Sequence, residues 1–272
     1  PRLVWHEDEP IAFPSSVPLY FVAHLAQERG VKVVLTGEGA DELFLGYPRY
    51  QVTPVNASLG RAYCALTPAS LRARIRGAIP SLPPKMRRYA RRSFFALEPT
   101  PHDLVYENFA VFPTPMQRHL LRPDLLDGRD PHAHELRLFE EAPGGLLERM
   151  SHADLQTYLV ELLMKQDQMS MAASIESRVP FLDQDLVELA GSFPRRLKLG
   201  HLATKLVLRE AVRAVMETVD VPLCFDSADP AALEAALAIY PGKALINSTT
   251  GEDEALDRVL PMARKYGAAV IA

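Results

Sequence analysis

The chain has 272 residues, of which 48% are hydrophobic and 24% are charged, a composition typical of one large or two medium globular domains. Its formal net charge of −4 argues against binding to nucleic acid through bulk electrostatics. Its two cysteines have no metal-ligand spacing, no apolar stretch approaches the roughly 18 residues of a membrane span, and no signal-peptide pattern opens the chain. We therefore expect a cytoplasmic protein that binds neither membrane nor nucleic acid. Since the chain begins Pro-Arg-Leu without an initiator Met, we also expect a fragment.

The first elements predicted are a helix over residues 16–29, which ends at Gly30, and a β-branched strand over residues 31–35. Such a strand is typical of a parallel sheet covered on both faces. Gly37 and Gly39 then permit a tight turn or the close approach of a ligand. Glu38 lies in this turn, at the carboxyl end of the strand, where open α/β sheets bind their ligands. The alternative is a plain connection from strand to helix, capped by acidic residues.

Two later stretches carry weaker signals. Residues 53–101 are basic, rich in proline and interleaved with aromatic residues, a pattern that favours short helices with a solvated arginine face over a site for RNA or phosphate. His132 and His134 flank Ala133 in an acidic, loop-like context, but no third ligand follows at a metal-binding spacing.

Residues 154–183 are predicted to begin with a buried helix that contains polar groups. Lys165, Asp167, Glu176 and Arg178 lie in or beside a run of Met, Ala, Ile and Val, where polar groups must be paired or used in function. An internal salt bridge is the alternative. Asp183 is then expected to cap a helix over residues 184–190.

Another helix is predicted to begin near residue 200, with Lys205 in its first turns. A lysine there opposes the helix dipole, which favours an anion in front of it, although a plain surface lysine is as good an explanation. The tail reads as β-α-β-α-β, with apolar strands near residues 221–225, 244–248 and 268–272.

Together these pieces resemble the synthetase domain of glutamine-dependent asparagine synthetases over about residues 1–212. Three motifs in the same order carry the resemblance: Thr36-Gly37-Glu38-Gly39-Ala40-Asp41-Glu42-Leu43-Phe44 with Gly46-Tyr47, the stretch from Lys165 to Asp183, and Thr204-Lys205 with Leu208-Arg209-Glu210-Ala211.

The resemblance implies adenylation of the side-chain carboxylate of aspartate by ATP, followed by displacement of AMP by ammonia. Thr36 and Gly37 would then lie against the nucleotide, and Asp41 would hold Mg²⁺. Glu38 would be the general base for the attack of ammonia, since a carboxylate among others can have a raised pKa.

The same resemblance places Lys165 and Lys205 on phosphates, with Lys205 on the leaving pyrophosphate. Cations there would stabilise the charge that builds up as pyrophosphate leaves. Glu42 and Arg178 would lie on the aspartate side. Relatives that form β-lactams share the acidic turn and the lysine, so the acceptor carboxylate is not fixed by these residues.

The sequence departs from the family pattern because the Ser-Gly-Gly-x-Asp-Ser pyrophosphate loop is absent. The glutaminase domain that would supply ammonia is absent too. We therefore expect an incomplete, doubly wound parallel sheet of the ATP-pyrophosphatase type with many helices, inactive on its own.

The tail resembles part of the pterin-binding barrel of methyltetrahydrofolate methyltransferases, in which Asp226 and Asn247 match pterin-binding groups at strand ends. About 59 residues cannot close a barrel of roughly 250 residues, so a βαβαβ fragment of a TIM-like barrel is expected. A generic βα unit that finishes the first domain is the alternative.

The sequence thus predicts an asparagine synthetase-like domain over residues 1–213 and a pterin-binding-like fragment over residues 214–272. Its predicted activity is ATP-dependent amide formation on aspartate. The alternatives are a folate-binding methyltransferase fragment, identified by Asp226 and Asn247, and a remnant without catalytic activity.

Overall fold

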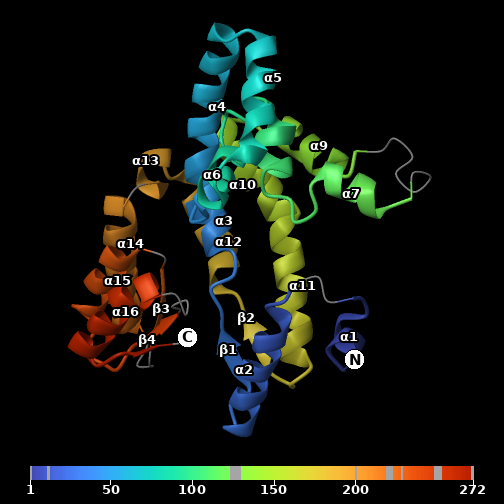
Figure 1. Cartoon of the computed structure of the whole chain (residues 1–272). Coiled ribbons are helices and arrows are strands. Elements are labelled where there is room, and N and C mark those ends of the chain that lie inside the picture. The colour runs from blue at the N-terminus through green and yellow to red at the C-terminus, as the bar shows by residue number, and fades with distance from the viewer. Residues whose placement is uncertain are drawn as a thin grey trace. The chain divides into compact units, whose positions relative to one another are not determined.

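A computed structural model describes residues 2–10, 13–122, 130–199, 201–218, 223–227, 229–247 and 253–270. The chain forms two compact units, unit 1 over residues 1–191 and unit 2 over residues 192–272. Each is a mostly helical α/β arrangement with one small parallel sheet (Figure 1). The predicted domain boundary at residue 213 stays a prediction.

Unit 1 contains most of the helices. Its elements are α1 Arg2–Glu7, α2 Ser16–Glu28, β1 Val33–Leu35, α3 Ala40–Phe44, α4 Pro48–Leu66, α5 Ala69–Ala78, η1 Ile79–Ser81, α6 Pro84–Arg91, η2 His102–Glu107, α7 Thr114–Leu120, α9 Ala133–Glu141, α10 Leu146–Gln156, α11 Tyr158–Met171, β2 Glu176–Arg178, η3 Pro180–Leu182 and α12 Gln184–Ser192.

The sheet of unit 1 joins β1 and β2 in parallel, with Val34 opposite Ser177 and Leu35 opposite Arg178. The strand, turn and helix around Glu38 form as predicted, and Gly30 ends the preceding helix with a φ of 76°. The expectation that β1 is covered on both faces is wrong, because Val33 is 50% and Leu35 72% exposed. Only Val34 on the other face packs on the small cluster that contains Ala23 and Ile175.

The region after residue 154 differs from its prediction in two ways. First, α10 and α11 are separate helices, divided at Thr157, whose hydroxyl donates to the carbonyl of Ala153 at 2.8 Å. Second, α11 is only partly buried, with Met164 50% and Met171 54% exposed, and Asp167 is an exposed residue, so the predicted buried helix with buried charges is wrong. The polar residues that α11 does bury are Gln166 and Ser170.

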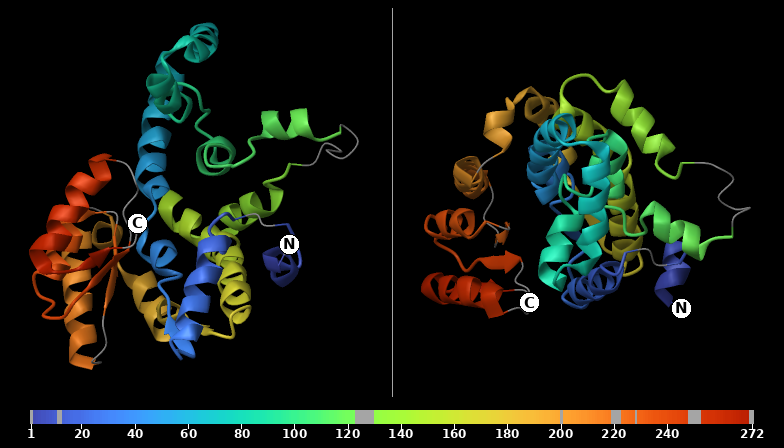
Figure 2. Two further views of the ribbon diagram at one scale, coloured as in Figure 1. Left: turned by 60° about the horizontal axis from the view of Figure 1, so that its bottom comes forward. Right: turned by 45° about the horizontal axis from the view of Figure 1, so that its top comes forward.

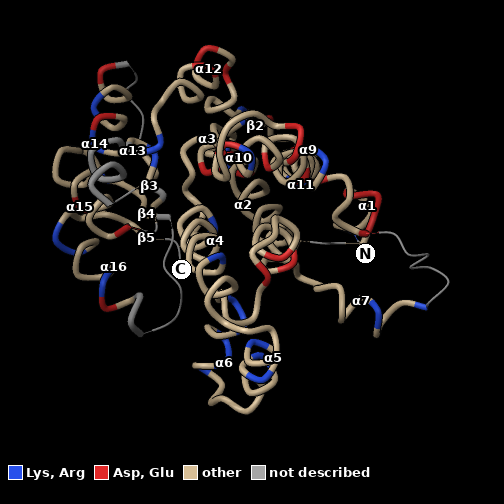
Figure 3. Tube along the Cα trace, turned by 90° about the horizontal axis from the view of Figure 1, so that it is seen from above, with Lys and Arg blue, Asp and Glu red and all other residues tan. Residues whose placement is uncertain are grey.

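The basic segment is helical, in α4, α5 and α6, as the favoured interpretation predicts (Figure 3), although α4, at 19 residues, is not a short helix. Pro54 lies inside α4 without ending it. Arg72 and Arg76 both pair with Glu98, at 3.3 and 2.6 Å, and most other arginines of the segment are exposed to solvent. Within the described residues, no helix is long and apolar enough to cross a membrane.

In unit 2 the predicted β-α-β-α-β order follows a long helix, α14 His201–Thr218. Its elements are α13 Arg195–Lys198, α14 His201–Thr218, β3 Cys224–Asp226, α15 Pro230–Leu237, β4 Leu245–Asn247, α16 Asp253–Tyr266 and β5 Ala269–Val270. The strands are all parallel, in the order β3-β4-β5 (Figure 2).

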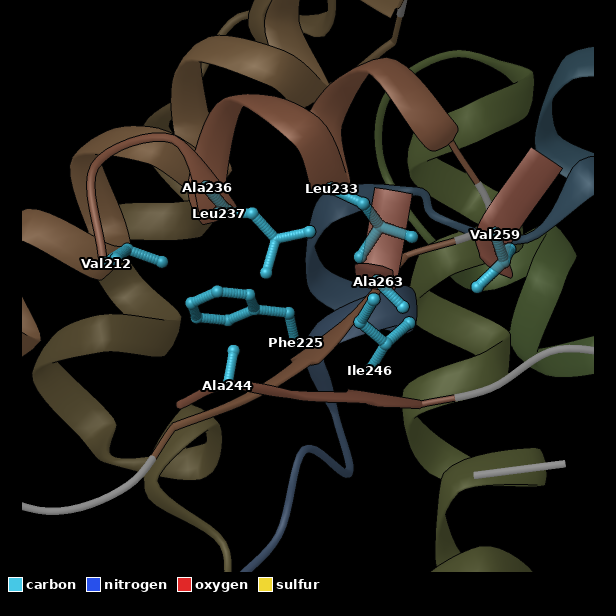
Figure 4. Packing of buried hydrophobic residues seen from close by; sticks show 9 residues of the cluster. All are labelled: Val212, Phe225, Leu233, Ala236, Leu237, Ala244, Ile246, Val259 and Ala263. Carbon is cyan, nitrogen blue, oxygen red and sulfur yellow. The ribbon is translucent and has the colours of Figure 1, made fainter. Parts of the chain in front are cut away.

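The core of unit 2 lies between this sheet and its helices (Figure 4). Phe225 of β3 and Ile246 of β4 are almost fully buried, and α14 adds Val212 to the same cluster. Helix α14 therefore shares a hydrophobic core with the tail, although it lies mostly before the predicted boundary.

Candidate functional site

The acidic turn, residues 36–39, leaves the sheet of unit 1 where both parallel strands end. The amide of Thr36 donates to the carbonyl of Arg178 at 2.8 Å, which continues the pairing of the strands by one residue. The amide of Ala40 donates to the carbonyl of Gly37 at 3.2 Å and closes the turn. Gly37 is exposed, and a Cβ there would meet no atom within 4 Å, so a ligand can approach its backbone.

Gly39 lets this turn pack closely against the segment that follows β2. Its φ of 92° is a conformation that side chains disfavour, and a Cβ would collide with the side chain of Leu182. The rings of Phe44 and Phe181 meet edge to face at 6.3 Å. The acidic turn with its following helix and the segment after β2 are distant in the sequence. Gly39 and the ring pair of Phe44 and Phe181 pack them together.

The short helix α3 separates the two carboxylates that follow the turn. Asp41 is an exposed residue whose carbonyl accepts from the amide of Gly46 at 2.9 Å. An exposed carboxylate suits Mg²⁺, which usually keeps several waters and takes one or two protein carboxylates. Glu42 points the other way and is only 1% exposed.

Glu42 is held inside unit 1 by hydrogen bonds from Tyr47, directly before α4, and from Ser151. The hydroxyl of Tyr47 donates to its Oε1 at 2.7 Å, and that of Ser151 in α10 donates to its carbonyl at 2.8 Å. Burial and the neighbouring Glu42 raise the pKa of Tyr47 far above its usual value, which keeps this phenol protonated as a donor. Glu42 thus ties α3 to α10, while its Oε2 is buried without a hydrogen-bond partner among the described residues.

Behind Glu42 lies a second buried charge cluster that the sequence did not predict. Nη2 of Arg49 lies 2.9 Å from Oδ2 of Asp154, which also accepts from the hydroxyl of Tyr50 at 2.5 Å. The guanidinium carbon of Arg49 lies 5.0 Å from the ring centre of Tyr47 and 4.9 Å from that of Tyr158. Burial raises the pKa of Asp154 to about 6, although Arg49 and Tyr50 lower it. The signal that was missed is Tyr47-x-Arg49-Tyr50, directly after the acidic helix.

Two other predicted site residues of unit 1, Arg178 and Lys165, lie in different surroundings. Arg178 lies at the end of β2 beside the acidic turn, and its exposed guanidinium contacts Glu176 at 2.5 Å. Lys165 of α11 lies 3.5 Å from the hydroxyl of Ser15 and 5.6 Å from the ring centre of Phe13. The structure therefore brings Arg178 to the turn, whereas the contacts it gives for Lys165 are with the segment before α2.

The remaining predicted side chains lie outside what the structure describes. The backbone of Lys205 is in α14, but its side chain is not described. Those of Asp226 and Asn247 are not described either, although the two residues are direct Cα partners at the carboxyl ends of β3 and β4. In the described part of the chain, no group of three His, Cys, Asp or Glu side chains could hold a metal ion.

Comparisons with known proteins identify two families. The family model for asparagine synthase matches residues 1–219, and the model for pterin-binding enzymes matches residues 204–272. No solved structure matches the chain.

Individual relatives agree with the first match. The chain is 34% identical over 221 residues to asparagine synthetase [glutamine-hydrolyzing] 1 of Bacillus subtilis, which is 79% of this chain and 33% of the relative. It is 36% identical over 219 residues to a putative asparagine synthetase of Mycobacterium tuberculosis, a match that covers 79% of this chain and 32% of the relative. It is 24% identical over 230 residues to the amidase chyE of Penicillium rubens, a match that covers 77% of this chain and 34% of the relative. The chain spans about a third of the length of these relatives. It belongs to the asparagine synthase family, and its last 69 residues match the pterin-binding family as well.

Proposed function

We propose that unit 1 contributes the acidic turn to an ATP-dependent ligase site that forms an amide on the side-chain carboxylate of aspartate, through an acyl-adenylate that ammonia attacks. The observation that carries this proposal is the position of the turn at the shared carboxyl edge of β1 and β2, where open α/β sheets bind ligands. Family membership and identities of 34–36% to asparagine synthetases support it.

In this proposal the exposed side of the turn faces the substrates. Thr36 and Gly37 bind the nucleotide, Asp41 holds Mg²⁺, and Glu38 takes a proton from the attacking ammonia. Mg²⁺ would supply positive charge for the phosphate groups that leave. The small parallel sheet would then be part of a doubly wound sheet of the ATP-pyrophosphatase type.

The remaining predicted groups have less direct roles. Arg178 lies beside the turn and is proposed to bind aspartate, while Lys165 and Lys205 are proposed to bind phosphates. Glu42 is buried, so its proposed part on the aspartate side is to position α3 rather than to contact the substrate.

The test uses a chimera, because the 272 residues contain no Ser-Gly-Gly-x-Asp-Ser loop. Residues 1–219 are joined to the upstream part of the Bacillus subtilis relative, and two activities are measured: aspartate-dependent exchange between pyrophosphate and ATP, and formation of asparagine from ammonia. Glu38→Gln should lower asparagine formation ~10²-fold or more and leave exchange intact, since only the ammonia step uses the base. Lys205→Ala should lower the exchange itself.

Glu140→Gln, an exposed glutamate of α9, is the matched control and should change neither activity. The 272-residue chain alone should show no exchange. If the Glu38→Gln chimera formed asparagine at the normal rate, the assigned base would be wrong. If it lost both activities, Glu38 would belong to the adenylation step instead.

A second candidate function belongs to the tail and rests on the direct pairing of Asp226 with Asn247 at the ends of parallel strands. In a complete TIM-like barrel these two positions would face a folate or other pterin. Two hydrogen bonds contribute only ~1 kcal/mol each, so we expect the chain to bind methyltetrahydrofolate more weakly than about 1 mM by equilibrium dialysis.

Micromolar binding would contradict that expectation. If such binding were lost in Asp226→Ala but kept in Asp257→Ala, an exposed residue of α16, then a methyltransferase-like role would replace amide formation as the leading proposal.

A further inference from the structure

A pocket of about 420 Å³ lies among the helical elements of unit 1, outside the acidic turn. Its walls come from α4, η2, α9, α10 and α11, all of them described. The groups on which the argument depends are Arg49, Tyr106, His132, Glu135, Tyr158 and Glu161.

The only arginine in this wall is already neutralised. Arg49 forms its ion pair with Asp154, and the faces of Tyr47 and Tyr158 lie within 5.0 and 4.9 Å of its guanidinium carbon. An incoming anion would therefore have to compete with a buried carboxylate for Arg49. This cost disfavours an anionic ligand.

Three carboxylates line the pocket, and Asp154, which pairs with Arg49, is the one that is neutralised in this way. Oε2 of Glu135 is buried and has no hydrogen-bond partner among the described residues, and Glu161 adds another carboxylate to the lining. Nε2 of His132, which also lines the pocket, lies 3.7 Å from Oε2 of Glu107 and is buried without a hydrogen-bond partner among the described residues. A buried acceptor without a donor is costly, so a ligand that donates hydrogen bonds would be favoured.

The shape of the wall around Glu135 is fixed by aromatic residues. The hydroxyl of Tyr106 donates to the carbonyl of Glu135 at 2.9 Å, and the Tyr106 ring stacks on His132 at 5.7 Å between ring centres. Phe109 and Tyr158 complete an aromatic lining. Aromatic faces attract organic cations and exclude water from the apolar part of a ligand.

We propose that this pocket binds a small organic cation, a primary amine whose ammonium group donates to Glu135 and whose apolar part lies against Tyr106, Phe109 and Tyr158. The charge of the pocket and its buried acceptor select the ammonium group, and the rings select the apolar part. This site does not depend on the amide-forming activity proposed above.

The test compares three probes of similar size that differ in charge: phenethylamine, 2-phenylethanol and 3-phenylpropanoate. Binding to the full chain is measured by ligand-observed NMR titration. The ammonium probe should bind at least about tenfold more tightly than either of the others. Glu135→Gln should weaken phenethylamine binding by about tenfold or more, because it removes the charge and keeps the shape of the side chain.

Glu140→Gln, an exposed glutamate on the same helix, should leave binding unchanged. Val160→Lys provides a second test that does not disturb the interior, since Val160 lines the pocket but is 44% exposed, and it should also weaken binding. The proposal is overturned if phenethylamine does not bind and the pocket holds only water, if all three probes bind alike, or if Glu135→Gln and Val160→Lys both bind phenethylamine as the unaltered chain does.

Discussion

Two carboxylates buried in unit 1, Glu42 and Asp154, are each held by the hydroxyl of a tyrosine. Their environments differ, because Asp154 also has an arginine beside it. Burial nevertheless dominates at Asp154 and raises its pKa from 3.8 to about 6. The folded chain therefore holds a proton on Asp154 over a range of pH in which the unfolded chain has lost it.

This shift sets the sign of a pH effect on stability. Between about pH 4 and about pH 6 the folded state binds more protons at Asp154, so its contribution to the free energy of unfolding falls as the pH rises. A shift of about two pKa units corresponds to about 3 kcal/mol. The free energy of unfolding of the unaltered chain, relative to that of Asp154→Asn, should therefore fall by up to that amount from about pH 4 to about pH 7.

Urea titrations followed by circular dichroism at several pH values measure this difference. Asp185→Asn, on the exposed start of α12, is the matched removal of a carboxylate. If the difference in free energy of unfolding between the unaltered chain and Asp154→Asn does not change with pH, then burial does not perturb the pKa of this carboxyl group.

At the scale of elements, local sequence signals predicted the structure well where they act within a few residues. The strand, turn and helix around Glu38 form as predicted. Asp183 caps α12 as predicted, since its Oδ1 accepts from the amides of Asp185 and Leu186 at 3.1 and 3.4 Å. Side-chain caps of this kind depend only on neighbouring residues.

Features that depend on distant partners were not predicted. Strand β2, Glu176–Arg178, has no alternating apolar pattern and forms through pairing with β1. The bond between Tyr50 and Asp154 spans 104 residues, so nothing local indicates it. The Arg49 cluster and the pocket beside it could not be predicted from the sequence for the same reason.

Helix α14 offers a test of packing within unit 2. Val212 is 4% exposed in the core of the tail, whereas Val215 on the same helix is 39% exposed. Val212→Ala should lower the free energy of unfolding by about 2 kcal/mol, because it removes two buried methyl groups and leaves a cavity. Val215→Ala should cost much less.

Urea unfolding of the full chain, monitored by circular dichroism, distinguishes the two valines. Equal losses for Val212→Ala and Val215→Ala would contradict the packing of α14 against the tail.

At the scale of the whole molecule, the two family matches overlap over residues 204–219, nearly all of which belong to α14. The compact units divide earlier, between Gly191 and Ser192. Helix α14 thus matches the sequence pattern of the asparagine synthase family and at the same time packs in the core of unit 2. The order of elements in the tail was predictable from its apolar strands, but the contribution of α14 to its core was not, because a helical period does not say which partner its apolar face will meet.

The uncovered face of β1 has a practical consequence for any study of this chain. Among the described residues, the two-stranded sheet has no further strand along its outer edges, and Val33 and Leu35 add exposed apolar surface on its face. Such an edge can pair with a strand of another molecule, so this chain is expected to self-associate as its concentration rises. Binding and unfolding measurements therefore belong at low protein concentration, and a charged residue in place of Leu35 is the first change to make if the purified chain precipitates.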